Sequence, residues 1–471
     1  MKRLKILAVG AVGLLTAVTL MSCYWMGNIG KGNITMELSG VQAKQEGEVV
    51  RVYLLADGKL FSTGGGVPFS AEVPLQPYPN DTRISIQGLP VGPVYQALVG
   101  IGAASGGIFY TNWYGNSSSF TLTPNKDTSV TVTTLFIPYS VSFAWELSGK
   151  NLKGVAAASS GVYAAEASKI YWAYYDYGQI YIDLQDNTYD MAANPVLSSY
   201  RVNSLSSSYN SSFSSTDAFL NTNNGIIPFE LSEGWYFDTS FTFDMTGPKN
   251  ILKSGYFLDP APYNYAYFFI RTGGLGGWYP NAEGPWVNLD RDGLLDMALG
   301  ATYAYFAAED GAFALPTAFL TDETPTLAEH QVRFSGPAKI LSLGFYPIIG
   351  ANPGGRLFMG TPNGVWEATV DETSAGSLIA SVADPETTRI IPETAGQRIE
   401  RIEISPYHPY DNQAFLSPYW LYIRYQGSVY EIPFFAVIPG RATGMAWDYD
   451  GNLYISGTEG LSAISVGYLG C

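Results

Sequence analysis

The sequence predicts an all-β protein, and three observations support that prediction. Short runs of alternating apolar and polar residues recur along the chain, separated by turn signals such as Asp-Gly, Gly-Gly-Gly and Pro-Asn. Pairs of such runs repeat in the C-terminal two thirds. After the first twenty residues, no segment has the 3.6-residue apolar period of an amphipathic helix.

Composition limits the classes of protein to which the chain can belong. Its 471 residues exceed the roughly 100–200 residues of one domain. A hydrophobic content of 46% supplies a large core and excludes wholesale disorder. The net charge of −16 argues against nucleic acid as a partner. Two cysteines cannot form a disulfide framework, and two histidines leave little for histidine-based metal or triad chemistry.

Residues 1–22 have the pattern of a signal peptide. Lys2, Arg3 and Lys5 form a positive start, and an apolar run follows from Ile6 to about Leu20. This run is shorter than the span of about 20 apolar residues that a transmembrane helix needs. We therefore expect the segment to be removed during export.

The tetrapeptide Leu20-Met21-Ser22-Cys23 resembles a bacterial lipobox. The resemblance implies cleavage before Cys23 and attachment of acyl chains, palmitate among them, which together make a stable membrane anchor. An ordinary secretory signal with an incidental cysteine is the alternative. Tyr24 stands where Asp would favour the inner membrane, so similarity to enterobacterial sorting favours the cell outer membrane. Residues 23–31 then form the lipidated cysteine and a tether.

Residues 32–142 are predicted to form a β-sandwich of short strands. The predicted strands are Val49–Leu55, Arg83–Gln87, Tyr95–Ile101, Ser119–Leu122 and Ser129–Phe136. The segment Gly88–Tyr95 resembles the GLPxGxY turn of prealbumin-like and carboxypeptidase-regulatory-like domains, which have Ig-like sandwich folds. Ser119–Thr123 and Asp127–Thr133 resemble the last two strands of those domains. The resemblance implies a spacer or binding module.

Residues 143–471 contain repeated hairpins. Gly355–Trp366 aligns with Gly451–Ser462, each reading turn, strand, glycine turn, strand. Looser copies are Gly161–Trp172, Tyr267–Tyr279, Tyr303–Leu315 and Trp420–Ile432. At about 40–50 residues per four-stranded blade, the region accommodates a six- to eight-bladed β-propeller. The stretch Gly444–Leu461 resembles the strand pair of NHL-type and sensor-type propellers. An unrelated second sandwich or a β-helix is the alternative.

One segment of the predicted propeller has low sequence complexity. Residues 204–224 are rich in serine and other polar residues, so we expect an inserted surface loop there.

The segment from Asn288 to Asp296 is a candidate Ca²⁺ loop. Oxygen-bearing side chains stand at positions 1, 3, 5 and 9, Gly293 at position 6 allows a sharp bend, and a backbone carbonyl is available at position 7. The candidate ligands are Asn288, Asp290, Asp292, Leu294 and Asp296. The segment resembles the loop of FG-GAP repeats in integrin-type propellers, although Asn rather than Asp comes first. The alternative is a polar hairpin turn, like that at Asp448–Gly451. No other cofactor is expected.

Aromatic residues supply a candidate binding surface. The chain has 34 Tyr and 10 Trp, with clusters at Tyr171–Tyr177, Tyr263–Phe269 and Tyr407–Tyr410. Tyr and Trp suit stacking on sugars or anchoring a protein partner, and packing between blades is the alternative. His330 and His408 have no catalytic spacing, and the sequence has no phosphate loop, Gly-x-Ser-x-Gly or CxxC motif. No catalytic residue is predicted, and we expect a protein that is not an enzyme.

These patterns together predict an outer-membrane lipoprotein that presents a propeller face to a protein or glycan partner. It would contact the membrane through its lipid and would not bind nucleic acid. A periplasmic scaffold or assembly factor is one alternative, and a polysaccharide-acting hydrolase or lyase is another. Whether the anchor faces the periplasm or the cell surface stays open.

Overall fold

The computed structural model divides the chain into two compact units, Met1–Ile137 and Pro138–Cys471. Their regular structure is almost entirely β-strand, interrupted by the short 3-10 helices η1 (Trp145–Leu147), η2 (Met191–Ala193) and η6 (Pro392–Thr394). Among the residues described, no helix is long and apolar enough to cross a membrane. The structure describes residues 31–38, 48–57, 59–62, 70–76, 82–105, 108–136, 140–158, 161–176, 179–182, 188–210, 215–231, 235–237, 250–259, 264–280, 287–289, 292–300, 303–316, 331–332, 339–347, 354–372, 389–408, 411–434 and 440–466.

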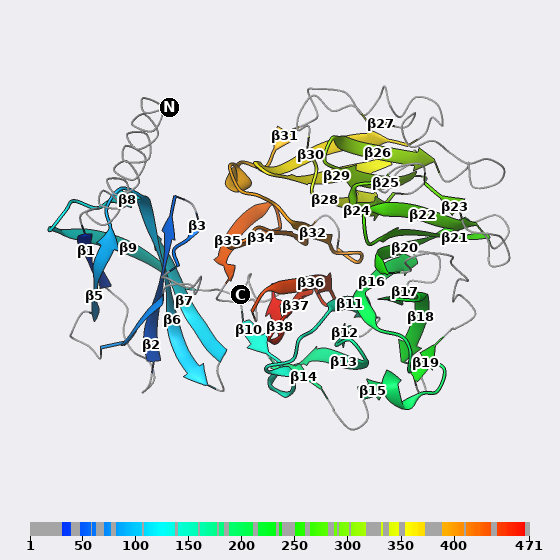
Figure 1. Ribbon diagram of the computed structural model, residues 1–471, viewed down its shortest axis with the longest axis horizontal. Helices are drawn as coiled ribbons and strands as arrows, with labels where there is room; N and C mark the ends of the chain where they lie inside the picture. Colours follow the sequence, from blue (N-terminus) through cyan, green and yellow to red (C-terminus); the bar gives the residue numbers. More distant parts are fainter. Residues whose placement is uncertain are drawn as a thin grey trace, which may run out of the picture. The chain divides into compact units, whose positions relative to one another are not determined.

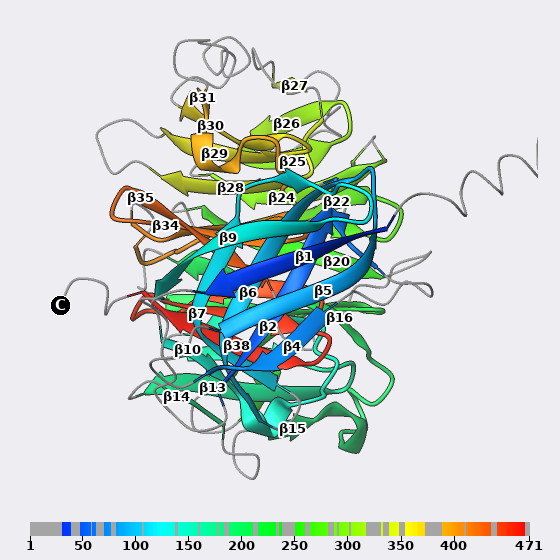
Figure 2. The same cartoon turned by 90° about the vertical axis from the view of Figure 1, so that its left-hand side faces the viewer.

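The first unit is a nine-stranded β structure around its own apolar core. Its strands are β1 (Lys31–Leu38), β2 (Glu48–Ala56), β3 (Lys59–Leu60), β4 (Ser70–Pro74), β5 (Thr82–Pro90), β6 (Val94–Ser105), β7 (Ile108–Ser117), β8 (Phe120–Thr121) and β9 (Asp127–Phe136). They form one hydrogen-bonded path in the order β3-β2-β6-β7-β9-β1-β5, with β4 on β2 and β8 on β6. The nine strands are therefore joined in one continuous sheet, and the sandwich stays a prediction (Figure 2).

This core is formed by strands in which buried apolar residues alternate with more exposed ones. In β1, Ile34, Met36 and Leu38 are buried while their neighbours are more exposed, which is the period of a strand with one buried face. β1 pairs in parallel with β9 and antiparallel with β5. The segment Gly88–Tyr95 forms the end of β5, a tight turn and the start of β6, and the buried Tyr95 hydroxyl donates to the Pro90 carbonyl oxygen at 2.8 Å.

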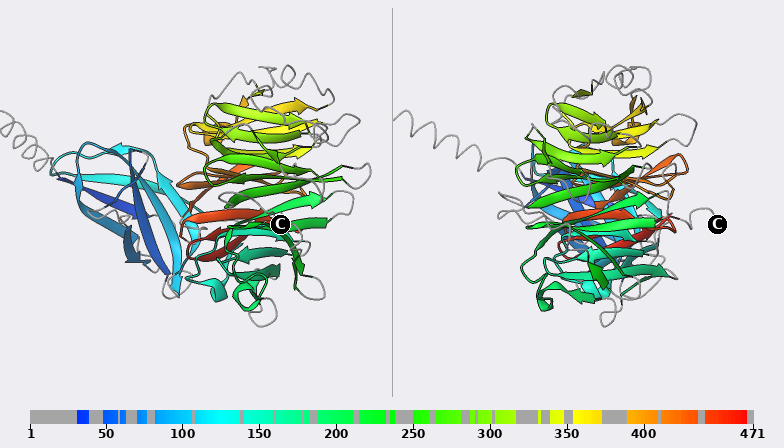
Figure 3. Two further views of the ribbon diagram at one scale, coloured as in Figure 1. Left: turned by 45° about the vertical axis from the view of Figure 1, so that its right-hand side comes forward. Right: turned by 90° about the vertical axis from the view of Figure 1, so that its right-hand side faces the viewer.

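The second unit contains seven antiparallel sheets arranged in a ring (Figure 1), and Figure 3 shows the same sheets from the side. Six of them are each built from one continuous stretch of chain, and the seventh joins β10 to the last three strands. Both features are those of a β-propeller, so the predicted propeller of six to eight blades is confirmed. The strands, blade by blade, are β11 (Gly154–Ala158), β12 (Gly161–Ala165), β13 (Lys169–Asp176), β14 (Gln179–Tyr181) and β15 (Thr188–Asp190); β16 (Val202–Asn210), β17 (Ser215–Thr222), β18 (Gly225–Leu231) and β19 (Trp235–Phe237); β20 (Ile251–Asp259), β21 (Asn264–Arg271), β22 (Leu275–Pro280) and β23 (Val287–Asn288); β24 (Leu294–Leu299), β25 (Tyr303–Ala308), β26 (Gly311–Pro316) and β27 (Gln331–Val332); β28 (Ser342–Pro347), β29 (Gly354–Thr361), β30 (Gly364–Asp371) and β31 (Arg389–Ile390); β32 (Arg401–Ile404), β33 (Gln413–Leu416), β34 (Trp420–Tyr425) and β35 (Ser428–Pro433); and β10 (Ser140–Phe143), β36 (Ala442–Trp447), β37 (Asn452–Gly457) and β38 (Gly460–Ser465).

In the six continuous blades the first strand lies innermost, and in the seventh blade the innermost strand is β36. Each of these seven strands contacts the next around the ring, from β11 through β16, β20, β24, β28 and β32 to β36, and β36 contacts β11 again. The ring is closed by β10, which pairs antiparallel with β38 from Ser140↔Ser465 to Phe143↔Ser462. The predicted boundary after residue 142 is therefore too late, because β10 belongs by its hydrogen bonds to the second unit.

The two clearest predicted hairpins are the middle strand pairs of their blades. Gly355–Trp366 falls in β29 and β30, and Gly451–Ser462 falls in β37 and β38. The glycines at which their third strands begin, Gly364 and Gly460, have φ of +130° and +147°, a backbone conformation that favours glycine. The four looser copies also coincide with strand pairs of other blades.

The loop predicted for residues 204–224 is wrong, because this segment forms the hairpin of β16 and β17. Several of its polar side chains form a network between two blades, in which Ser206 and Asn221 are buried. The Asn221 amide donates to the Ser204 hydroxyl at 2.9 Å and to the Ser206 hydroxyl at 2.8 Å. The Ser254 hydroxyl from β20 donates to the Asn221 carbonyl oxygen at 2.6 Å. Small hydroxyl groups satisfied by an amide can line an interior as apolar residues do.

Innermost strands approach so closely that some positions have no room for a side chain. A Cβ on Gly154 in β11 would lie 2.8 Å from the Leu205 backbone nitrogen in β16. A Cβ on Gly444 in β36 would lie 3.0 Å from the Val155 nitrogen in β11. Both neighbours are backbone atoms, which cannot rotate away.

We predict that Gly154→Ala destabilises the second unit. At an unstrained position this change normally stabilises by about 0.4–1 kcal/mol, so a net loss in chemical denaturation would report the clash with β16. Gly427→Ala is the comparison variant: nothing lies within 4 Å of its added Cβ, so any loss there measures its φ of +80° alone, whereas Gly154 has no left-handed φ and its loss measures the clash. An unfolding free energy unchanged or raised by Gly154→Ala would contradict the close packing of β11 and β16.

Candidate functional site

Irregularities in the innermost strands determine where polar groups lie near the propeller axis. Register shifts interrupt β16 at Val202/Ser204, β20 at Ile251/Lys253, β24 at Leu294/Asp296 and β36 at Ala442/Gly444. A bulge of this kind redirects the side chain that follows it. In three of these strands the residue after the shift is polar: Ser204, Lys253 and Asp296.

Each of these three side chains reaches the innermost strand of the next blade. The Ser204 hydroxyl donates to the Leu252 carbonyl oxygen in β20 at 2.5 Å. Lys253 Nζ donates to Asp296 Oδ1 at 2.5 Å. Asp296 Oδ2 accepts from the Leu343 backbone nitrogen in β28 at 2.9 Å. These contacts, which we call the axial polar chain, link four consecutive innermost strands.

Two residues of β32 extend the charge around the axis. Arg401 and Glu403 both interact electrostatically with Asp296, and Glu403 also interacts with Lys253. The pKa of Glu403 is raised to about 7, chiefly because the carboxyl is removed from water; the Lys253 and Arg401 cations oppose the rise and the nearby Asp296 adds to it. The backbone carbonyl of Glu403 accepts from Trp447 Nε1 at 3.3 Å, which ties β32 to β36.

This axial group combines two cations with two carboxylates from three blades. Lys253 and Asp296 neutralise each other, whereas Arg401 is exposed and Glu403 partly exposed. A carboxyl with a pKa near 7 can accept or donate a proton at neutral pH. The arrangement is therefore able to hydrogen-bond a polar ligand or a loop of a partner at the axis.

The candidate calcium ligands are only partly brought together. Asp292 is exposed, while Leu294 begins β24 with its side chain buried. Asp296 belongs to the axial polar chain and also accepts from the Met297 nitrogen at 2.8 Å. Asn288 lies in β23 with its backbone paired to Gly277, and Asp290 lies outside the described residues. Across the described part of the chain, no group of three His, Cys, Asp or Glu side chains is placed to hold a metal.

The predicted aromatic clusters are divided between the core and a half-exposed row. Phe268 and Phe269 are fully buried and Tyr171 nearly so, which is packing within the propeller. Trp172 and Tyr174 in β13 and Tyr181 in β14 are more exposed. Their ring centroids are 5.1 Å apart between Trp172 and Tyr174 and 5.5 Å apart between Tyr174 and Tyr181. His408 Nε2 contacts the Tyr449 carbonyl oxygen at 3.1 Å, as expected for a loop histidine. Cys23 and His330 lie outside the described residues.

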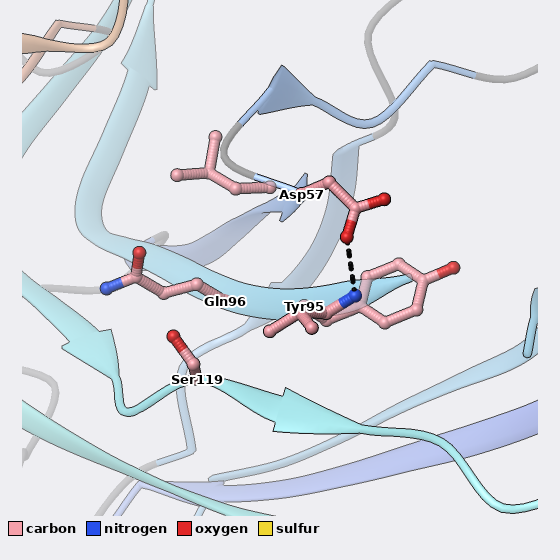
Figure 4. Close-up of a pocket in the computed structure, with 6 residues that line it drawn as sticks. Asp57, Tyr95, Gln96 and Ser119 are labelled. Atoms are coloured by element: carbon pink, nitrogen blue, oxygen red, sulfur yellow. Dashed lines mark hydrogen bonds between the residues drawn. The ribbon is translucent and has the colours of Figure 1, made fainter. Parts of the chain in front are cut away.

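The first unit has a pocket of about 350 Å³ at the start of β6 (Figure 4). It is lined by Leu55, Asp57, Val94, Tyr95, Gln96 and Ser119. Its polar groups are largely occupied, because Asp57 Oδ1 accepts from the Val94 nitrogen at 2.9 Å and Gln96 donates to the Ser117 carbonyl oxygen at 3.2 Å. Burial raises the pKa of Tyr95 to about 12. We therefore interpret the pocket as part of the packing around the turn between β5 and β6.

Sequence reasoning missed the axial group. Lys253, Arg401 and Glu403 are isolated charges in apolar strands, with no motif spacing between them. One signal was available, namely a charged residue within the first three positions of an innermost strand. Using that signal requires knowing which strand of each blade lies innermost.

We predict that Glu403 makes stability fall as pH rises from about 4.5 to about 7. In this window the native state keeps a proton that the unfolded chain releases, because the pKa is raised from 4.5 on folding. The slope from this group cannot exceed about 1.4 kcal/mol per pH unit, because a single carboxyl releases at most one proton on unfolding. Glu403→Gln should flatten the slope measured by denaturation, whereas Glu400→Gln, at an exposed position, should not. Equal slopes in wild type and Glu403→Gln would refute the assignment.

A second prediction concerns calcium. The motif predicts a heat of binding in calorimetric titration with Ca²⁺, lost in Asp292→Asn. Because Asp296 is engaged by Lys253 and β28, Asp296→Asn should leave the Ca²⁺ affinity unchanged. Absence of heat at millimolar Ca²⁺ would reject the site.

Comparisons with known proteins find no matching family model and no matching curated protein. Among solved structures, similar ones include PorZ, described as an essential bacterial surface component of the type-IX secretion system of Porphyromonas gingivalis, with 13% identity over 68% of this chain and a TM-score of 0.45. This chain covers 37% of that PorZ chain. YCF48 bound to a D1 peptide gives 12% identity over 71% of this chain and 97% of that one, with a TM-score of 0.45. The WD40 propeller domain of Doa1 gives 12% identity over 67% and 93%, with a TM-score of 0.42.

Proposed function

We propose that the protein is a lipid-anchored binding protein of the bacterial cell envelope that presents a propeller face to a protein or glycan partner without catalysing a reaction. The observation that carries the proposal is the closed ring of seven sheets in the second unit. Such a ring holds its loops on a rigid disc, and binding residues are commonly placed on loops positioned by a rigid scaffold.

Two groups of side chains favour binding over structural support alone. The axial group offers the exposed Arg401 and the partly exposed Glu403 to a polar ligand. The row of Trp172, Tyr174 and Tyr181 offers aromatic faces of the type that stack on sugars or anchor proteins. A protein or a glycan partner would each find suitable chemistry.

The lipid anchor and the first unit complete the proposal. Cys23 would carry the acyl chains, with residues 23–31 as the tether and the outer membrane as the location. The first unit would act as a prealbumin-like spacer or binding module, in keeping with the turn at Gly88–Tyr95. Folding around its own apolar core, as the described strands do, suits such a module.

The second candidate is a periplasmic scaffold or assembly factor of the outer membrane. The propeller and the anchor fit it equally well, because propellers host many unrelated functions. A polysaccharide-acting hydrolase or lyase is the third candidate, for which the partly exposed carboxyl of Glu403 is the available acid. A glycan array followed by a search for released product separates a lectin from such an enzyme.

We predict that Cys23→Ser moves the protein from the membrane fraction to the soluble fraction of the cell envelope, while wild type stays in the outer membrane. On intact cells, added protease should cleave the wild-type protein if it binds partners at the surface. Protection until the outer membrane is permeabilised would reject the surface binder in favour of the scaffold. Membrane association unchanged in Cys23→Ser would reject the lipid anchor.

A further inference from the structure

One carboxylate in the propeller is surrounded by three arginines from two blades. Glu367 lies in β30 with its side chain 4% exposed. Its Oε1 accepts from Arg356 Nη1 of β29. Its Oε2 accepts from Arg389 Nη2 of β31 at 3.5 Å and from Arg424 Nη1 of β34, in the neighbouring blade, at 3.4 Å. We call these four residues the arginine cluster.

The cluster has more positive than negative charge. Three guanidiniums and one carboxylate leave two positive charges, and within the described residues the three arginines make no ion pair with any other carboxylate. Such a local excess of cations contrasts with a chain whose net charge is −16. Guanidiniums repel one another, and the negative charge of a single carboxylate does not neutralise three of them.

The guanidiniums are held in place, and the contacts among the described residues occupy only some of their N–H donors. Arg424 lies against Gln413, whose Oε1 is 3.5 Å from Nη1, and the guanidinium of Arg356 lies 6.0 Å from the centre of the Tyr346 ring. An arginine has five N–H donors, and Glu367 uses few of them. Exposure increases outward, from 19% for Arg424 and 36% for Arg356 to 66% for Arg389. The cluster thus has a buried base and an open rim.

We propose that the arginine cluster is a binding site for a doubly charged oxyanion, that is, a phosphate group carried as a monoester or free, or a free sulfate ion. Two unmatched positive charges call for an anion of charge near two, and a phosphate monoester has that charge with three strong acceptor oxygens. Guanidinium forks match the geometry of such oxygens better than ammonium groups do. Glu367 acts as the positioning residue that keeps three cations together before the anion arrives.

This inference goes beyond the proposed function. It assigns ligand chemistry to the boundary between two blades, away from the innermost strands that carry the axial group, and it requires neither a membrane anchor nor a surface location. Its failure would leave the fractionation and accessibility experiments unaffected, and their failure would leave it standing.

The test is calorimetric titration of the full chain with methyl phosphate at low ionic strength, where salt screens the charges least. Wild type should bind methyl phosphate and inorganic phosphate or sulfate, but not dimethyl phosphate, which carries one charge. Arg389→Gln should weaken binding by about tenfold, the equivalent of one charge-assisted hydrogen bond. Arg398→Gln is the matched control, because Arg398 is exposed and pairs with Glu400.

Glu367→Gln supplies a second measurement that does not depend on binding heat. With the buried carboxylate removed, three guanidiniums lack any counter-charge, so the melting temperature should fall and methyl phosphate should restore it more strongly than it stabilises wild type. No heat with any of the dianions, equal binding of the monoester and the diester, or equal affinity in wild type and Arg389→Gln would each overturn the proposal. Arg389 is two-thirds exposed, so its loss leaves the folded propeller available for the comparison.

Discussion

Antiparallel pairing between β10 and β38 is the contact on which the propeller depends. Each blade packs its two faces against neighbours, so the ring is stable only when every sheet has a sheet on both sides. Without β10, the edge of β38 from Ser462 to Ser465 would carry unpaired backbone groups, and open edges of this kind favour association with other chains. Four residues that precede the first blade therefore complete the last one, and the remaining six sheets hold their places because the circle is closed.

A closed ring forces the seven innermost strands together, and this crowding determines where polar chemistry can occur. Glycine at Gly154 and Gly444 removes side chains where backbones meet. Bulges in β20 and β24 direct Lys253 and Asp296 toward the next blade, so their charges pair around the axis. Farther out, where strands are less crowded, the arginines around Glu367 have room to accumulate charge of one sign. The two groups differ in charge balance because they differ in distance from the axis.

Much of the fold could be predicted from local signals in the sequence. Turn glycines flanked by alternating residues, as at Gly364 and Gly460, predicted the hairpins correctly. A glycine turn and an alternating strand each depend on only a few neighbouring residues. The serine-rich stretch was misjudged, since its hydroxyls are satisfied by Asn221 and Ser254, partners that composition alone cannot reveal. A turn repeated in two blades also escaped prediction: Thr222 at the end of β17 and Thr361 at the end of β29 each donate to the carbonyl of the glycine three residues later, at 2.8 Å. The charged groups depend on contacts between blades and so had no local signature. Asp296 shows the converse. Its segment matches the sequence pattern of a metal-binding loop, but a bulge in β24 directs its side chain toward the next blade instead.

Closure by β10 also sets an order in time. During translation β10 emerges before any blade, and its partner β38 emerges last, more than three hundred residues later. The entropy of closing so long a loop must be overcome before the contact contributes stability, which makes the step slow. A nascent chain that stops before β36 would carry six sheets and an unpaired β10. Pairing of β38 with β10 is thus the step that turns an open arc of sheets into a closed ring.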